Sequence, residues 1–150
     1  MLIQNGFKGS EIVVDVIMLI EAGSDFGGVW HFNKYPQARV DSETPLYQLS
    51  LPQAWRFFTF KERFPGHVEL QEYLTHMANA LDLRTTGIFN SRVIDAKFDS
   101  DTKGWVIQTE NSLVAKSQYV VFATGTTNKP YILDFPGKES FCGSIIDPAA

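Results

Sequence analysis

The stretch VDVIMLIE at residues 14–21, followed by Ala22-Gly23-Ser24, decides the fold class of this chain. It is apolar and rich in β-branched residues, and it stops abruptly at an acid and turn residues. A short, continuous apolar run of this kind is typical of a strand that is buried on both faces of a parallel sheet. The sequence therefore predicts a parallel strand whose carboxyl end carries Glu21.

The other elements follow from spacing and turn chemistry. Apolar residues at helical intervals predict a helix at 67–83, with Glu69, Glu72, His76 and Asn79 on its polar face. Two strands at 92–98 and 105–110 flank the loop DSDTKG, which indicates a β-hairpin. A strand at 114–123, apolar throughout YVVFA, is expected to be buried on both faces, and the tail at 126–150 to be mostly irregular. This order predicts an α/β domain with an antiparallel hairpin insertion.

Composition excludes several classes of function. The chain has 150 residues, about one domain, and a net charge of −4 without any basic run. Nucleic-acid binding and a polybasic membrane signal are therefore not expected. The most apolar stretch, 12–20, is too short to span a bilayer, so a cytoplasmic protein is expected. Cys142 is a lone cysteine, and the three histidines lack metal-ligand spacing, so we expect no disulfide and no metal site.

Three local features suggest a dinucleotide. Glu21, at the end of a buried strand, can accept hydrogen bonds from ribose hydroxyls, and Thr124-Gly125 ends another strand at the edge where cofactors bind in open α/β sheets. Gly27-Gly28 can let the backbone approach a ligand closely. Each feature taken alone fits an ordinary turn or strand end equally well or better.

Taken together with longer segments, these features resemble the FAD- and NADPH-dependent Baeyer–Villiger monooxygenases. The resemblance runs in order from 16 to 143 and includes ERFPGH at 62–67, VVFATGTTNKP at 120–130 and FPGKESFCG at 135–143. Its most specific part is GGVWHFNKYPQARVD at 27–41. Within the family, the chain is most similar to enzymes of fungal secondary metabolism. The resemblance implies a partial Rossmann-like FAD-binding domain at 16–150, with 1–15 unassigned.

The resemblance also implies roles for individual residues. Glu21 would bind the adenosine ribose of FAD, the backbone of Val93 would meet the adenine, and Thr124-Gly125 would pass the diphosphate. The backbone at Gly28 would approach the cofactor closely. Residues at the flavin and its ribityl chain would be Val29, Trp30, His31 and Phe32, with Asp41 and Tyr47 near the isoalloxazine ring and Arg39, Val40 and Asp41 at the nicotinamide of NADP.

The chemistry of these residue types agrees with such a site. Trp30, Phe32 and Tyr35 could supply the flat apolar walls that a flavin ring requires, although core packing is the alternative for Trp30 and Phe32. Asp41 is the candidate catalytic residue, because a carboxylate can orient a cation that stabilises developing negative charge.

The sequence departs from the family at both ends. No Gly-x-Gly-x-x-Gly turn precedes the strand at 16–21, although Gly6 and Gly9 are present, and Asp147 stands where the family has His. We therefore expect a truncated homologue that lacks the first βα unit and the NADPH domain. Such a chain should bind FAD more weakly by several kcal/mol, in the order of a few charge-assisted hydrogen bonds, and leave a hydrophobic sheet edge exposed.

Three functions remain open. The parent activity would insert one oxygen atom beside a ketone and give an ester or lactone, but the chain alone is not expected to complete this reaction. The chain could instead be a non-catalytic partner that self-associates or docks on a full-length flavoprotein through its sheet edge. It could also be a redox-independent isomerase or cyclase in which Asp41, Glu43 and His31 act as acids or bases.

Overall fold

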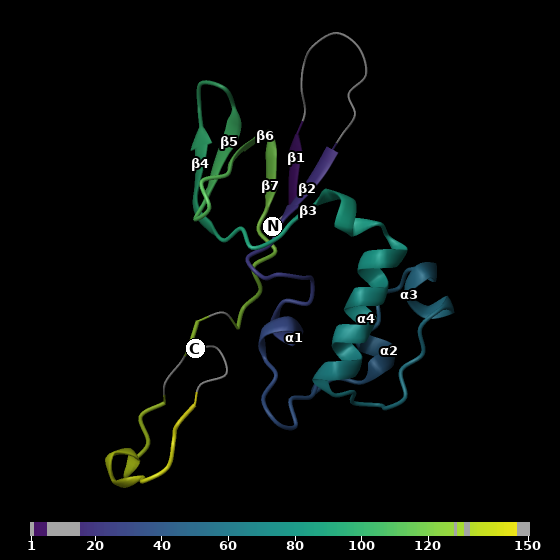
Figure 1. Cartoon of the computed structure of the whole chain (residues 1–150), viewed down its shortest axis with the longest axis vertical. Helices are drawn as coiled ribbons and strands as arrows, with labels where there is room; N and C mark the ends of the chain where they lie inside the picture. The colour runs from purple at the N-terminus through teal and green to yellow at the C-terminus, as the bar shows by residue number, and fades with distance from the viewer. Residues whose placement is uncertain (1, 6–15, 128, 131–132, 147–150) are drawn as a thin grey trace.

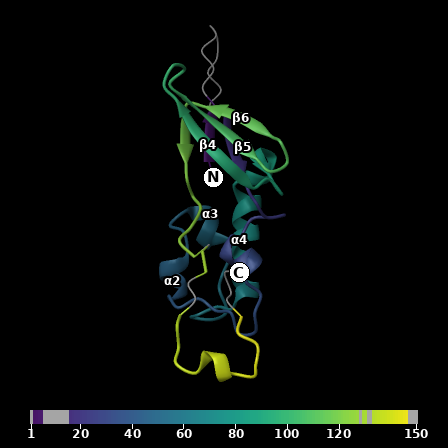
Figure 2. The same cartoon turned by 90° about the vertical axis from the view of Figure 1, so that its left-hand side faces the viewer.

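The computed structural model describes residues 2–5, 16–127, 129–130 and 133–146. The strands gather at one end, the helices lie beside and below them, and the C-terminal stretch extends from the opposite end (Figures 1 and 2). Gly6, Gly9 and Asp147, which the sequence analysis singled out, lie outside the described residues.

A four-stranded sheet has the order β3-β2-β1-β7. Strand β2 (Val16–Ile20) pairs in parallel with β3 (Gly87–Ile88), which confirms the predicted parallel strand. Strand β1 (Leu2–Asn5) pairs antiparallel with β2 and, on its other side, with β7 (Tyr119–Val121). Because β1 lies between β2 and β7, β2 is not an edge strand, and the apolar strand β7 forms the outer edge of this sheet instead.

The second sheet contains the predicted hairpin. Strands β4 (Val93–Asp99) and β5 (Gly104–Thr109) pair antiparallel, and β6 (Val114–Ser117) adds a third strand beside β5. At the hairpin turn the Asp99 carboxylate accepts hydrogen bonds from the Asp101 amide at 2.9 Å and the Thr102 hydroxyl at 2.8 Å. The turn chemistry of DSDTKG therefore predicted this element correctly.

The single strand predicted at 114–123 is wrong. The chain forms β6 and β7 with Gln118 between them, and these two strands belong to different sheets. The Ser117 hydroxyl donates to the Tyr119 carbonyl oxygen at 2.9 Å across the break. Tyr119 is 59% exposed and Val121 54%, whereas Val120 between them packs against the core. Strand β7 therefore covers only one of its faces, although its sequence is apolar throughout.

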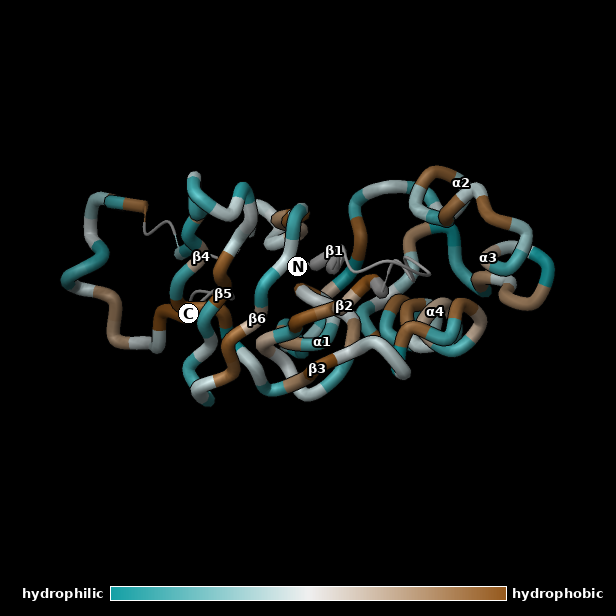
Figure 3. Tube along the Cα trace, turned by 90° about the horizontal axis from the view of Figure 1, so that it is seen from above, coloured by the Kyte–Doolittle hydropathy of each residue, from teal (hydrophilic) through white to brown (hydrophobic). Residues whose placement is uncertain are grey.

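The hydrophobic core of the strand region lies where the two sheets meet. Its buried members are Ile20 from β2, Ile107 from β5 and Ala115 from β6, and partly buried apolar side chains pack around them. Strand β2 is apolar along its whole length (Figure 3). Full burial of a side chain such as Ile107 contributes about 1.5–3 kcal/mol.

Helix α4 (His67–Ala80) confirms the predicted helix and ends three residues earlier than the predicted bound. Its buried residues are Leu70, Tyr73, Met77 and Ala78. Tyr73 and Met77 pack with Ala54 of α3 (Pro52–Arg56), and the Tyr73 hydroxyl accepts a hydrogen bond from the Leu49 amide at 2.8 Å. The apolar face of α4 therefore packs against the segment at 49–60.

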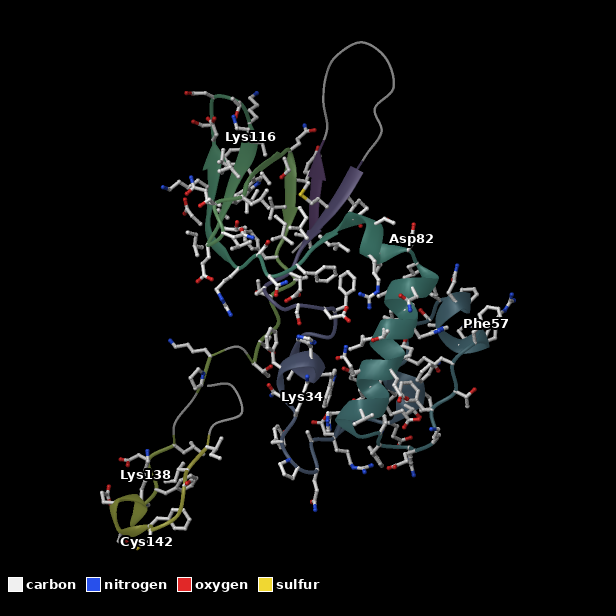
Figure 4. All side chains as sticks on the ribbon, in the orientation of Figure 1. Lys34, Phe57, Asp82, Lys116, Lys138 and Cys142 are labelled. Carbon is white, nitrogen blue, oxygen red and sulfur yellow. The ribbon has the colours of Figure 1, made fainter. Side chains whose placement is uncertain are left out.

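Other helical segments are short. They are α1 (Val29–Phe32), α2 (Thr44–Tyr47) and two 3₁₀ turns, η1 (Leu83–Thr86) and η2 (Lys138–Ser140). His76, expected to be solvated, is half-buried, and its Nε2 lies 3.0 Å from the Gln53 carbonyl oxygen. Cys142 is exposed in the C-terminal loop, far from the sheets (Figure 4). Among the described helices, none is long and apolar enough to cross a bilayer.

Candidate functional site

Glu21 follows β2 directly and is fixed by its own turn. Its Oε1 accepts a hydrogen bond from the Gly23 amide at 2.7 Å. Its backbone amide donates to the Ile88 carbonyl at 2.9 Å, and its carbonyl accepts from the Ser91 amide at 2.9 Å. The carboxylate is half-exposed at the carboxyl end of a parallel strand, where ligands bind in open α/β sheets. This geometry stabilises the turn and holds the carboxylate in one orientation.

The structure brings Val93 into the same neighbourhood. The Asn90 amide donates to the Gly23 carbonyl at 2.9 Å, and the Ser91 amide bonds to Glu21, so residues 90–91 run along the turn at 21–23. Val93 begins β4 two residues later and packs against the core cluster around Ile20. Two backbone hydrogen bonds therefore join the Glu21 turn to the segment at 90–91 that leads into Val93.

Gly27 and Gly28 form a turn that non-glycine residues would strain. Their φ angles are +137° and +52°. A Cβ on Gly27 would clash with the carboxamide of Gln71 on α4, which donates from Nε2 to the Phe26 carbonyl at 2.7 Å. A Cβ on Gly28 would meet nothing within 4 Å. The turn is thus clamped on the helix side by Gln71 and open at Gly28.

Trp30 and Tyr47 come together although 17 residues separate them. The indole Nε1 donates a hydrogen bond to the Tyr47 hydroxyl, and the two rings meet edge to face at 6.3 Å between centroids and 74° between planes. Trp30 lies in α1 and Tyr47 ends α2. The two aromatic side chains expected near the flavin therefore form one continuous, half-buried aromatic surface.

His31 and Phe32 pack together beside the Glu21 turn. Their rings meet edge to face at 5.1 Å, and a Cβ on Gly23 would lie 3.1 Å from both side chains. The ring Nε2 of His31 lies 3.3 Å from the Ser24 hydroxyl. Phe32 is 55% exposed and Val29 39%. His31 and Phe32 therefore lie beside the turn at 23–24, and Phe32 and Val29 are accessible to another molecule.

The three side chains of the segment Arg39-Val40-Asp41 lie in different environments. Val40 is buried at 6% exposure, whereas Asp41 is exposed. The Arg39 guanidinium binds the Glu62 carboxylate and the Phe64 carbonyl oxygen. Arg39 is thus directed to the loop before α4.

Thr124-Gly125 lies just beyond β7. Both residues are exposed, Gly125 has a φ of +73°, and a Cβ there would meet nothing within 4 Å. The backbone at this position is therefore open to close approach by another molecule.

Sequence analysis did not identify the side chains that hold the segment at 25–27 in place. Besides Gln71, these include the Arg84 guanidinium, which pairs with the Asp25 carboxylate at 2.9 Å. The hydrogen bond from Arg84 lowers the pKa of Asp25, partial burial opposes this shift, and the Phe26 amide adds to it. Asp25 precedes the glycine pair by two residues, but no local signal linked it to Arg84, 59 residues away.

No group of three or more His, Cys, Asp or Glu side chains in the described part of the chain could hold a metal ion. The candidate site is built from one oriented carboxylate, aromatic rings and open glycine backbone.

Comparison with known proteins gives a consistent result. No protein-family profile matches the chain. It is 41% identical over 128 residues to the FAD-binding monooxygenase acrE of Aspergillus aculeatus, which covers 85% of this chain and 22% of the relative. It is 36% identical over 127 residues to cyclopentanone 1,2-monooxygenase of Comamonas sp., covering 85% and 23%.

Solved structures agree with these relatives. Cyclohexanone monooxygenase from Rhodococcus sp. Phi1, bound to NADP⁺, matches with a TM-score of 0.75 and 30% identity over 89% of this chain and 25% of that protein. The OTEMO complex with FAD and NADP matches with a TM-score of 0.72 and 31% identity, covering 83% and 24%. The chain spans about a quarter of the length of these proteins and is homologous to that segment of the Baeyer–Villiger and other FAD-binding monooxygenases, including fungal ones.

Proposed function

We propose that this chain forms one wall of the FAD site of a Baeyer–Villiger-type monooxygenase. The observation that carries the proposal is the contact between Trp30 and Tyr47, two aromatic residues distant in sequence. An indole whose N–H is already satisfied by a phenol can present its remaining surface to a flat heteroaromatic ring without leaving a buried polar group unpaired.

The residues present fit FAD at its two ends. At the adenosine end, the Gly23 amide donates a hydrogen bond to Oε1 of Glu21, so the other carboxylate oxygen can accept hydrogen bonds from ribose hydroxyls. At the flavin end, the aromatic surface is half-exposed and lies next to the open backbone of Gly28. Between them, we assign the diphosphate to the open backbone of Thr124-Gly125.

Bound FAD would supply the redox chemistry that amino-acid side chains lack. Val29, Trp30, His31 and Phe32 would hold the flavin and its ribityl chain. We assign Asp41, which is exposed, to orienting a cation near the reacting atoms, and the segment beginning at Arg39 to the nicotinamide of NADPH. Arg39 would leave Glu62 to reach a nucleotide.

The reaction of the whole enzyme would insert one oxygen atom next to a ketone and give an ester or lactone. Relatives of this chain are named for cyclopentanone and for acetone. We propose a ketone as the substrate class. Because the chain spans about a quarter of each relative, we expect these 150 residues alone to bind FAD weakly and to oxidise NADPH no faster than a blank.

Fluorescence tests the proposal directly. FAD bound beside Trp30 should quench its emission, so a titration of the purified chain with FAD should give saturable quenching. Trp30→Phe should remove most of that saturable signal. Trp55→Phe is the matched control, because Trp55 is 52% exposed on α3, where the Arg56 guanidinium packs on it.

The outcome separates a flavin wall from ordinary packing. If both tryptophan variants retain the same saturable quenching, or if the wild-type chain shows none at high FAD, the flavin assignment is wrong. A thermal shift on addition of FAD provides a second readout, because a ligand that binds the folded state raises Tm.

A second candidate function, docking on another polypeptide, is favoured by strand β7. It ends the four-stranded sheet and exposes Tyr119 and Val121. An exposed strand edge can pair with a strand of a partner or a second copy. Sedimentation velocity of the wild-type chain and of Val121→Lys checks this, because the charge should abolish any association that uses β7.

A further inference from the structure

The turn between β5 and β6 reaches the residues that hold Glu21. The Asn111 carboxamide donates to the Ser91 hydroxyl at 2.8 Å and to the Asn90 carbonyl at 3.3 Å. Its oxygen accepts a hydrogen bond from the Thr109 hydroxyl. A single side chain therefore bonds to two consecutive residues of another segment, while its own position is fixed by Thr109.

Those two residues are the ones that flank the Glu21 turn. The Ser91 amide donates to the Glu21 carbonyl at 2.9 Å, and the Asn90 amide donates to the Gly23 carbonyl at 2.9 Å. Gly23 in turn donates to the Glu21 carboxylate at 2.7 Å. The chain of contacts runs from Asn111 through residues 90–91 to the carboxylate.

The centre of this connection is buried at Ser91, whereas Asn111 is exposed. Ser91 is only 1% exposed, and its hydroxyl donates to the Phe89 carbonyl at 3.0 Å while accepting from Asn111. Asn90 has a φ of +52°, in the left-handed region. Asn adopts this region more readily than other non-glycine residues, and the Asn111 amide bonds to the Asn90 carbonyl in this conformation.

We propose that Asn111 is a positioning residue for adenosine recognition, holding residues 90–91 so that Glu21 presents its free carboxylate oxygen to a ribose. The inference rests on the proposed function, because it assigns the adenosine end of FAD to Glu21 and Val93. It extends that function because it assigns a role to the hairpin insertion: Asn111, in the turn after β5, fixes the residues that bind the adenosine half of FAD. The flavin half, at Trp30 and Tyr47, rests on α1 and α2 instead.

This division predicts a selective defect. FMN lacks the adenosine that FAD carries, so loss of the Asn111 contacts should weaken FAD and leave FMN unchanged. We expect Asn111→Ala to raise the dissociation constant for FAD about tenfold, equivalent to about 1.4 kcal/mol, and that for FMN less than twofold. Ser91→Ala removes the hydroxyl that accepts the Asn111 hydrogen bond and should likewise raise the dissociation constant for FAD more than that for FMN. Glu110→Gln is the control, since this exposed neighbour pairs only loosely with Arg92, at 3.9 Å.

A ligand-free readout keeps the two proposals distinguishable. In nuclear magnetic resonance spectra, the Gly23 amide proton should exchange with solvent at least several-fold faster in Asn111→Ala and Ser91→Ala than in Glu110→Gln. Unchanged Gly23 exchange, or equal losses of FAD and FMN affinity, would overturn the positioning role. A wild-type chain that binds neither FAD nor FMN would overturn the proposed function and the adenosine assignment together, while the Gly23 exchange still decides whether Asn111 holds the turn.

Discussion

The Gly27 turn permits a prediction whose size follows from the structure. Replacing Gly27 with Ala places a Cβ at a φ of +137°, which costs about 1–3 kcal/mol. The new methyl group would also displace the Gln71 carboxamide and break its hydrogen bond to the Phe26 carbonyl, which adds about 0.5–1.5 kcal/mol. We expect Gly27→Ala to lower the free energy of unfolding by about 2–4 kcal/mol and Tm by about 5–15 °C.

Gly28→Ala is the matched control. Gly28 has φ +52° and ψ −123°, which lies outside the left-handed helical region, and its Cβ would meet nothing within 4 Å, so only backbone strain contributes, at about 1–3 kcal/mol. Because Gly27→Ala already breaks the Gln71 hydrogen bond, Gln71→Ala should cost less in the Gly27→Ala background than in the wild type, by about 0.5–1.5 kcal/mol. Urea unfolding followed by circular dichroism measures the wild type, the three single variants and the Gly27→Ala/Gln71→Ala double variant. Equal losses for Gly27→Ala and Gly28→Ala would refute the reasoning.

Two further predictions concern pH and packing. Because Arg84 lowers the pKa of Asp25, the carboxylate contributes stability at neutral pH that is lost as pH falls below about 4. Near neutral pH, Asp25→Asn should therefore have a free energy of unfolding about 0.5–1 kcal/mol lower than the wild type in urea unfolding, and near pH 2 the two should be equal. The difference is small because both side chains of the ion pair are a third exposed or more. Leu70→Ala should cost about 2–5 kcal/mol in the same assay because Leu70 is fully buried, whereas Tyr73→Phe should cost about 1–3 kcal/mol by leaving the Leu49 amide unpaired.

Sequence patterns predicted the elements that depend on local chemistry. Helix α4 follows from apolar spacing, and the β4–β5 hairpin from the turn residues at 99–104. Strand β2 follows from a short apolar run that ends in turn residues. In each case, the residues that decide the structure lie within one element and its flanking turn.

The errors arose where partners distant in sequence decide the outcome. The apolar run at 119–123 does not reveal that the chain leaves one sheet at Ser117 and joins the edge of another at Tyr119. Strand β1 has only four residues, too few for a periodicity to be recognised. The contact between Trp30 and Tyr47 and the support of Glu21 by Asn111 likewise depend on tertiary packing, which no local pattern contains.

The pairing of β1 with a strand distant in sequence affects folding during synthesis. β1 pairs locally with β2, but its other edge waits for β7, since Leu2 is opposite Val121. During translation, the edge of β1 that pairs with β7 stays unpaired until residues 119–121 have been synthesised. During this interval nascent chains on neighbouring ribosomes offer competing strands, so expression at lower temperature or with a chaperone should raise the yield of monomer.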